Sequence, residues 1–245
     1  PFSLLHIDTG HNFSETLQFR DELAERLNVR LVVGKVEDSI QRQTALEENG
    51  PNANRNRAQS ITLLESMESF GFDAAIGGGR RDEEKARAKE RFFSHRDAFG
   101  QWDPKNQGPE IWHLYNGRLN QGEQFRVFPI SNWTELDVWE YIQKENILLP
   151  SLYFAHQRPC VKRKESILAQ SSYLVPHDTD ELLDLTVRFR TIGDMTISGA
   201  MISTASTVVD IITELKEMNQ SERGSRADDF RSESSMEDRK KEGYF

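Results

Sequence analysis

Apolar positions follow two different periods along the first third of the chain. Short apolar runs at residues 2–7, 29–33 and 72–76 predict strands. Between them, apolar side chains recur at helical spacing over residues 14–27 and 58–67, and Gly71 is positioned to end the second helix. Strands that alternate with helices are typical of a parallel sheet with right-handed crossovers, so the pattern predicts an α/β fold with helices flanking the sheet.

The remainder of the chain has a weaker pattern. Residues 126–130 predict another strand, and Asn132 with Glu135 three positions later predicts a helix over residues 134–147. Beyond Pro150 the periodicity fades, except for a helix predicted over residues 207–218.

We therefore predict two parts: an α/β domain over residues 1–150 and an irregular C-terminal extension over residues 151–245. The last residues, 219–245, are strongly polar but end in Tyr244 and Phe245. This aromatic end indicates a tail that docks onto the active site or onto a partner.

Composition narrows the possible ligands. The chain has 31 Lys and Arg against 40 Asp and Glu, a net charge of −9, which argues against a nucleic-acid partner. Its basic residues gather at residues 80–91 and 223–241, a distribution that suits a small anionic ligand.

Cysteine and histidine usage narrow the chemistry further. A single cysteine, Cys160, excludes a disulfide framework and fits a cytoplasmic protein. The six histidines show no metal-ligand spacing, so we predict no protein-bound metal. No apolar run approaches the length of a membrane span, so we expect no membrane contact.

A glycine turn followed by arginines is the strongest candidate site. The turn directly follows the strand predicted at residues 72–76, where backbone N–H groups can approach a ligand closely. Arginine forks match tetrahedral oxyanions, so the segment predicts a phosphate or sulfate site at the carboxyl edge of the sheet. The candidate residues are Gly77, Gly78, Gly79, Arg80, Arg81, Lys85 and Arg87. A solvated helix with Glu–Lys pairs would explain residues 84–91, but not the glycines and the arginine pair.

A second polar loop, Asp8-Thr9-Gly10, follows the first predicted strand. Its side chains are suited to accept hydrogen bonds from a ribose or a base. The alternative is that Asp8 or Thr9 caps the following helix. Because both loops are expected at the same edge of one sheet, we favour nucleotide binding.

Several segments together resemble the sulfate adenylyltransferase subunit 2 family, the small, catalytic subunits of bacterial ATP sulfurylase. They include Asp8-Thr9-Gly10 and, after the glycine turn, Gly79-Arg80-Arg81-Asp82-Glu83. The other matching segments are residues 72–79, 102–107, 128–135, 187–191, 221–223 and 240–245. The resemblance covers nearly the whole chain.

The resemblance implies an adenine-nucleotide α-hydrolase-like (PP-loop) fold, related to the phosphoadenylylsulfate reductases. In this family a loop of the type Ser-Gly-Gly-x-Asp-Ser wraps the pyrophosphate of ATP. That motif is absent from this sequence, and the family order would locate it before Pro1, so we expect this N-terminal segment to be missing here.

The resemblance also implies a reaction, adenylyl transfer from ATP to sulfate giving adenylylsulfate and pyrophosphate. Mg²⁺ bound with ATP and a GTPase large subunit that drives the step are expected with it. Because sulfate needs no general base, the predicted roles of Arg80, Arg81, Lys85 and Arg87 are positioning and charge neutralisation.

Two alternatives remain from the sequence. The chain could be a non-catalytic interaction subunit, which the missing PP-loop would favour. It could also be a sulfonucleotide reductase, but such an enzyme needs a cysteine near its carboxyl end, whereas Cys160 lies in the middle of the chain.

Overall fold

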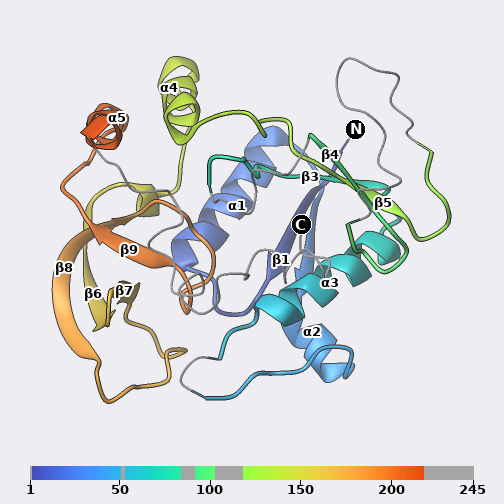
Figure 1. Ribbon diagram of the computed structural model, residues 1–245, viewed down its shortest axis with the longest axis horizontal. Coiled ribbons are helices and arrows are strands. Elements are labelled where there is room, and N and C mark those ends of the chain that lie inside the picture. Colours follow the sequence, from blue (N-terminus) through green and yellow to red (C-terminus); the bar gives the residue numbers. More distant parts are fainter. Residues whose placement is uncertain (1, 51–52, 84–91, 103–117, 218–245) are drawn as a thin grey trace.

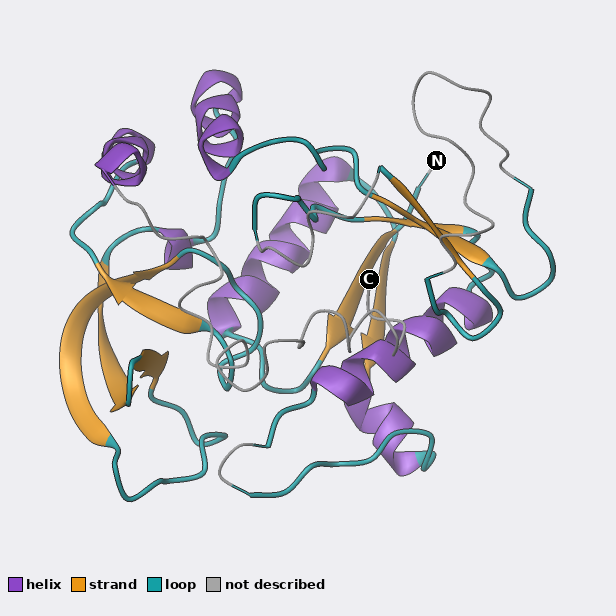
Figure 2. Cartoon of the chain, viewed as in Figure 1, coloured by secondary structure: helices purple, strands orange, loops and turns teal. Residues whose placement is uncertain are grey.

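A computed structural model describes residues 2–50, 53–83, 92–102 and 118–217 (Figure 1). Its helices lie mainly around short parallel strands, and its later strands form a separate barrel at one side of the molecule (Figure 2). The described helices are α1 (Ser14–Leu27), α2 (Val36–Gln41), α3 (Asn56–Ser69), α4 (Glu135–Glu145) and α5 (Val208–Glu217), with a 3₁₀ turn, η2, at Ser151–Tyr153. Within these residues, none of the helices has both the length and the apolar character needed to cross a membrane.

The predicted parallel pairing is confirmed, but the strands belong to two sheets. β1 (Leu4–Asp8) pairs in parallel with β2 (Leu31–Lys35). β5 (Gln124–Val127) lies between β3 (Ala74–Ile76), which is parallel to it, and β4 (Phe93–Arg96), which is antiparallel. Within the described residues, the expectation of one continuous sheet is therefore wrong.

The third strand is less buried than its apolar sequence predicted. β3 is only three residues long, and Ile76 at its end is 74% exposed. Its one hydrogen-bonded neighbour in the described sheet is β5, so the opposite edge of β3 is open there. Apolar composition alone predicted the strand, but burial depends on what packs on both sides.

The expectation of an irregular C-terminal extension is wrong for its first half. Strands β6 (His156–Arg163), β7 (Ser166–Ala169), β9 (Gly199–Ile202) and β8 (Glu181–Phe189) close, in that order, into an antiparallel barrel (Figure 1). The barrel encloses a fully buried cluster that includes Leu152, Cys160, Val187 and Phe189. The helix predicted at residues 207–218 is confirmed as α5, whereas the predicted docking of residues 219–245 lies outside the described residues.

The ends of α1 and α4 differ from the predicted caps. α4 begins at Thr134, whose side chain accepts a hydrogen bond from the Asp137 backbone, while Asp137 accepts one from Thr134 in return. This pair replaces the predicted Asn132–Glu135 box. α1 has the predicted bounds, but its N-cap is Phe13, which makes no side-chain cap. Phe13 is fully buried in the barrel cluster instead, so α1 starts at the barrel and runs towards the β1–β2 pair (Figure 1).

Candidate functional site

The β1–α1 loop is a closed polar turn. The Asp8 carboxylate accepts a hydrogen bond from the Gly10 backbone N–H at 2.8 Å. Thr9 is 2% exposed, and its N–H donates to the Asn12 side-chain oxygen at 3.0 Å. Neither Asp8 nor Thr9 caps α1, because the helix begins beyond them at Phe13. The capping alternative is therefore wrong, and the turn is organised by its own side chains.

Arg55, at the start of α3, holds the β1–α1 loop through a hydrogen bond and is itself held by two ion pairs. Its Nη1 donates to the Thr9 carbonyl at 2.6 Å, and its Nη2 pairs with Glu47 at 2.5 Å and with Glu37 at 3.2 Å. Hydrogen bonding to Glu47 is the main factor that raises the pKa of Arg55. Gly10 adopts a left-handed φ of 74°, and a Cβ there would lie 2.9 Å from Arg55 Nη1. The loop is therefore held rigid, which favours a binding role.

The barrel contacts the same loop. The Met195 N–H donates to the His11 carbonyl at 2.9 Å, and Asn12 forms an isolated bridge with Asp194. The His11 ring stacks on Tyr173 with centroids 4.3 Å apart. Burial, and then the positive charge of Arg55, lower the pKa of His11. The β1–α1 loop thus lies between the start of α3 and the barrel.

The glycine turn after β3 runs beside the chain that leaves β5. The Gly77 N–H donates to the Val127 carbonyl at 2.9 Å, and the Arg81 N–H donates to the Ser131 carbonyl at 3.0 Å. Gly78 is exposed, and a Cβ there would meet nothing within 4 Å. Gly77 and Gly78 do not have positive φ angles. Gly78 therefore leaves open space above the backbone because it has no side chain, and its backbone conformation does not itself require glycine.

Arg80 and Arg81 lie in different environments. Arg80 is 4% exposed, with Nη1 at 3.7 Å from Asp82 and Nε at 3.9 Å from Glu83. Arg81 is half-buried. Asp82 also accepts the backbone N–H of Glu135 at 2.9 Å, which connects this turn to the start of α4. Arg80 therefore lies among carboxylates of its own chain, and Arg81 is the more accessible arginine of the pair.

The structure brings together only part of the predicted site. Asp8 ends β1 and is followed by Thr9 and Gly10, whereas the predicted residues of the glycine turn follow β3 in the other sheet: Gly77, Gly78, Gly79, Arg80 and Arg81. The predicted Lys85 and Arg87 lie outside the described residues. Within the described residues, no group of three or more His, Cys, Asp or Glu side chains is arranged to hold a metal ion.

Sequence reasoning missed a set of arginines that are buried within strands. Arg126 on β5 is 3% exposed, and Arg188 on β8 is fully buried. Arg190, just after β8, forms an ion pair with Glu135 at the start of α4, and both side chains are almost fully buried. The alternation Gln124-Phe125-Arg126-Val127 was the available signal, because it gives a strand one polar and one apolar face.

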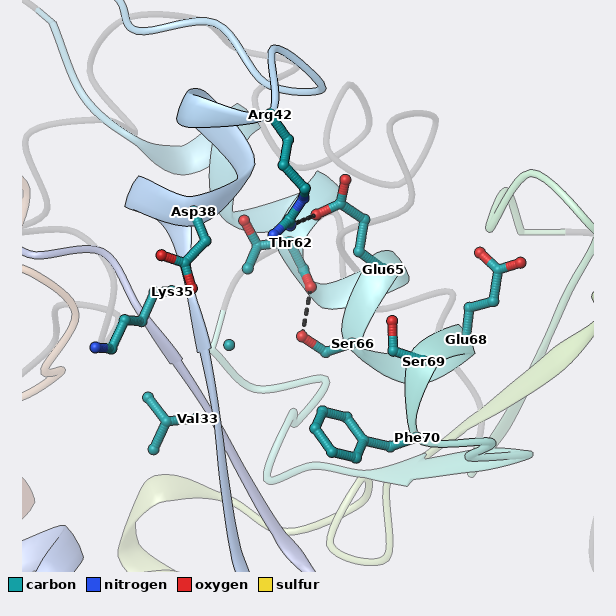
Figure 3. A pocket seen from close by; sticks show the side chains of 11 residues that line it. Val33, Lys35, Asp38, Arg42, Thr62, Glu65, Ser66, Glu68, Ser69 and Phe70 are labelled. Atoms are coloured by element: carbon teal, nitrogen blue, oxygen red, sulfur yellow. Dashed lines mark hydrogen bonds and ion pairs between the residues drawn. The ribbon is translucent and has the colours of Figure 1, made fainter.

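A polar cavity of about 470 Å³ lies beside β2, α2 and α3 (Figure 3). Arg42 and Glu65 pair across part of it at 2.6 Å, and the Ser66 hydroxyl donates to the Thr62 carbonyl at 2.7 Å. Because Arg42 and Glu65 satisfy one another, and because no residue of the two loops lines the cavity, we do not assign it to the candidate site.

Parallel strands with flanking helices, and polar loops at the ends of the strands, define an α/β protein with candidate ligand-binding loops. In agreement, the phosphoadenosine phosphosulfate reductase domain family matches residues 1–200. This match covers both candidate loops and the barrel strands β6, β7 and β8.

Individual relatives give a more specific assignment. The chain is 55% identical to "Sulfate adenylyltransferase subunit 2" of Mycolicibacterium gilvum over 246 aligned residues, which cover 100% of this chain and 79% of that protein. The proteins of the same name from Mycobacterium bovis and Mycobacterium tuberculosis are each 52% identical, with the same coverage. The chain belongs to the sulfate adenylyltransferase subunit 2 family, which confirms the resemblance drawn from its motifs.

Proposed function

We propose that the protein transfers the adenylyl group of ATP to sulfate, the first step of sulfate activation. A sulfate oxygen attacks the α-phosphorus, a new P–O bond forms, and the bond from the α-phosphorus to the bridging oxygen breaks to release pyrophosphate. The observation that carries this proposal is the 55% identity, over the whole chain, to a protein named for this activity.

The chain's own residues have two tasks in this reaction. Sulfate is an anion at neutral pH, so no general base is required; the obstacle is the approach of two anions. We assign charge neutralisation to Arg81, with Lys85 and Arg87, and nucleotide contact to Asp8, Thr9 and Gly10 together with the Gly77–Gly79 turn. The buried Arg80 would position this turn through Asp82 and Glu83.

Mg²⁺ and a partner subunit complete the proposal. Because the described residues hold no metal-ligand group, we assign Mg²⁺ to the phosphates of ATP, where it would supply charge neutralisation. The name "subunit 2" of the relatives supports a large partner subunit. Its identity as a GTPase rests on the family resemblance, and the expected cytoplasmic location rests on the single cysteine.

The reductase alternative is disfavoured by the one cysteine. Cys160 is fully buried on β6, and burial raises the pKa of its thiol. A nucleophilic cysteine needs an accessible thiolate, so Cys160 is unsuited to that role. The non-catalytic alternative is separated from the proposal by the assay below.

A pyrophosphate-release assay tests the proposed function. The protein is combined with its large subunit, ATP, GTP and Mg²⁺, with sulfate or with chloride at the same ionic strength. We expect pyrophosphate release that depends on sulfate and on the protein. Release that is absent, or that is equal with chloride, would favour the non-catalytic alternative.

A further inference from the structure

Arg126 has an unusual environment for a buried arginine. It lies in β5, the middle strand of its sheet, opposite Ala75 of β3 and Ser94 of β4. The side chain is 3% exposed, and its Nη1 donates to the Gln124 side-chain oxygen. Within the residues that the structure describes, Nε and Nη2 of Arg126 have no hydrogen-bond partner. A buried guanidinium without a counter-ion is costly, so this position demands an explanation.

Other arginines of the same chain show what the edge of the guanidinium formed by Nε and Nη2 binds. Arg188 donates from Nε and Nη2 to Glu214. Arg190 uses the same two atoms for Glu135, and Arg163 uses them for Asp180. In each case a carboxylate, a planar oxyanion group, occupies the edge. At Arg126 this edge is formed in the same way, but none of the described carboxylates occupies it.

The pKa of Arg126 agrees with the lack of a nearby carboxylate among the described residues. Burial alone lowers the pKa of Arg126, to about 10, and no carboxylate acts in the opposite direction. The group is still a cation at neutral pH. It is therefore a positive charge in a poorly solvated place, where an incoming anion gains the most.

The position of Arg126 connects it to the candidate site. The next residue, Val127, accepts the Gly77 N–H, which opens the glycine turn. Further along, the Ser131 carbonyl accepts the Arg81 N–H. Arg126 thus lies one residue before the edge at which parallel β3 and β5 both end, where ligands of parallel sheets bind.

We propose that Arg126 binds a tetrahedral oxyanion, either sulfate or a phosphate group of ATP, through its Nε and Nη2 edge. The proposal rests on the proposed function for the identity of these two anions. It adds to that function a binding residue inside the sheet, beside the arginines of the glycine turn. Sulfate and phosphate share the tetrahedral geometry and charge that suit an arginine fork.

Thermal unfolding of the full chain tests this without any catalytic assay. Wild type, Arg126→Met and Arg126→Lys are compared in sodium sulfate, in ATP and in sodium chloride at matched ionic strength. We expect sulfate or ATP to raise the Tm of the wild type beyond the chloride value. Arg126→Met should lose this extra increase, and in chloride it should be at least as stable as the wild type, because an unpaired buried charge is removed.

Arg188→Met is the matched control. Its guanidinium is equally buried, but the same edge is bound to Glu214, so this variant should lose stability in every medium and keep the anion-dependent increase. The increase that remains in Arg126→Met measures the general stabilisation that sulfate gives to any folded protein.

The comparison of sulfate with ATP identifies the ligand, and the lysine variant tests the role of the guanidinium fork. A change confined to sulfate identifies sulfate as the ligand, and a change confined to ATP identifies a phosphate. Arg126→Lys keeps the charge but not the fork, so titration calorimetry should show about tenfold weaker anion binding, the loss of one charge-assisted hydrogen bond. This variant decides the matter if Arg126→Met does not fold.

The proposal is overturned if sulfate and ATP raise the Tm of Arg126→Met as much as that of the wild type, or if Arg126→Lys binds the anion as tightly as the wild type. Both results are independent of the pyrophosphate-release assay. A protein that binds sulfate through Arg126 but releases no pyrophosphate would disprove the proposed function alone.

Discussion

Arg80 and Arg81 are neighbours in the sequence, yet their surroundings assign them different tasks. Arg80 is enclosed with Asp82 and Glu83, whereas Arg81 is half-buried and attached through its backbone to Ser131. A guanidinium held by its own chain supports the shape of a site. An accessible guanidinium can approach a ligand as charge develops in the transition state.

Substituting each arginine should therefore give different results. Arg81→Ala should reduce kcat by about 10²–10³-fold, the usual cost of one lost transition-state donor. Arg80→Ala should instead lower the Tm, because Asp82 and Glu83 lose their buried cation. Thermal unfolding and pyrophosphate release are measured on both variants. Full activity of Arg81→Ala would exclude it from the chemistry.

Gly10 offers a second prediction at this scale. Gly10→Ala should cost about 1–2 kcal/mol for the left-handed backbone, plus the strain of displacing Arg55. Urea unfolding measures this cost, and nucleotide titration should show weaker ATP binding. Gly71→Ala is the control, because Gly71 has a similar φ of 64° but a Cβ there would meet nothing within 4 Å. Equal losses for the two variants would mean that the contact with Arg55 contributes nothing.

Among the elements, sequence reasoning succeeded where the pattern is local. The bounds of α1 were predicted because its apolar spacing is decided within the helix itself. The barrel was missed because strands such as β7, only four residues long, are stabilised by partners far away in the sequence. The same reason explains the missed arginines. An arginine in a short strand is predicted to be exposed from its sequence, because its burial depends on elements elsewhere in the chain that pack over it.

The ion pair that joins the start of α4 to the end of β8 gives a prediction about stability. Arg190 and Glu135 form a nearly buried ion pair, and the Glu135 N–H is bound by Asp82 of the glycine turn. Arg190→Met should cost about 3–5 kcal/mol, because it removes the cation that is paired with the buried Glu135 carboxylate, and Glu135→Gln should also destabilise the protein. The double variant should cost clearly less than the sum. A double-mutant cycle from urea unfolding measures this coupling, and additive losses would contradict it.

At the scale of the whole molecule, the barrel and the β1–α1 loop are parts of one structure. Arg158 of the barrel forms an ion pair with Glu15 of α1, and its guanidinium lies over the Phe13 and Phe189 rings at 5.4 and 5.9 Å. The barrel also holds the His11 carbonyl through Met195. A loop that the sequence predicted to bind nucleotide is therefore supported by a barrel that the sequence did not predict.

The stability of the protein should depend on pH through two half-buried histidines, His6 and His11. Burial lowers the pKa of His6, with a further contribution from Arg20, and burial together with Arg55 lowers the pKa of His11. In the unfolded chain both rings take up a proton near the ordinary value of 6.5. Below that pH the unfolded state binds more protons than the folded state, so the free energy of unfolding should fall as the pH falls, and level off below the folded pKa values.

Urea unfolding between pH 7.5 and 5 measures this dependence, a range that lies above the titration of the carboxylates with lowered pKa values, such as Asp180. His11→Gln should remove part of the pH dependence, and the double variant His6→Asn/His11→Gln should remove most of it. Because His11 stacks on Tyr173 and lies beside Arg55, its protonation should also loosen the β1–α1 loop. ATP affinity should therefore weaken over the same pH range in the wild type and less in His11→Gln. A wild-type stability that stays constant across this range would show that the two rings titrate alike in the folded and unfolded states.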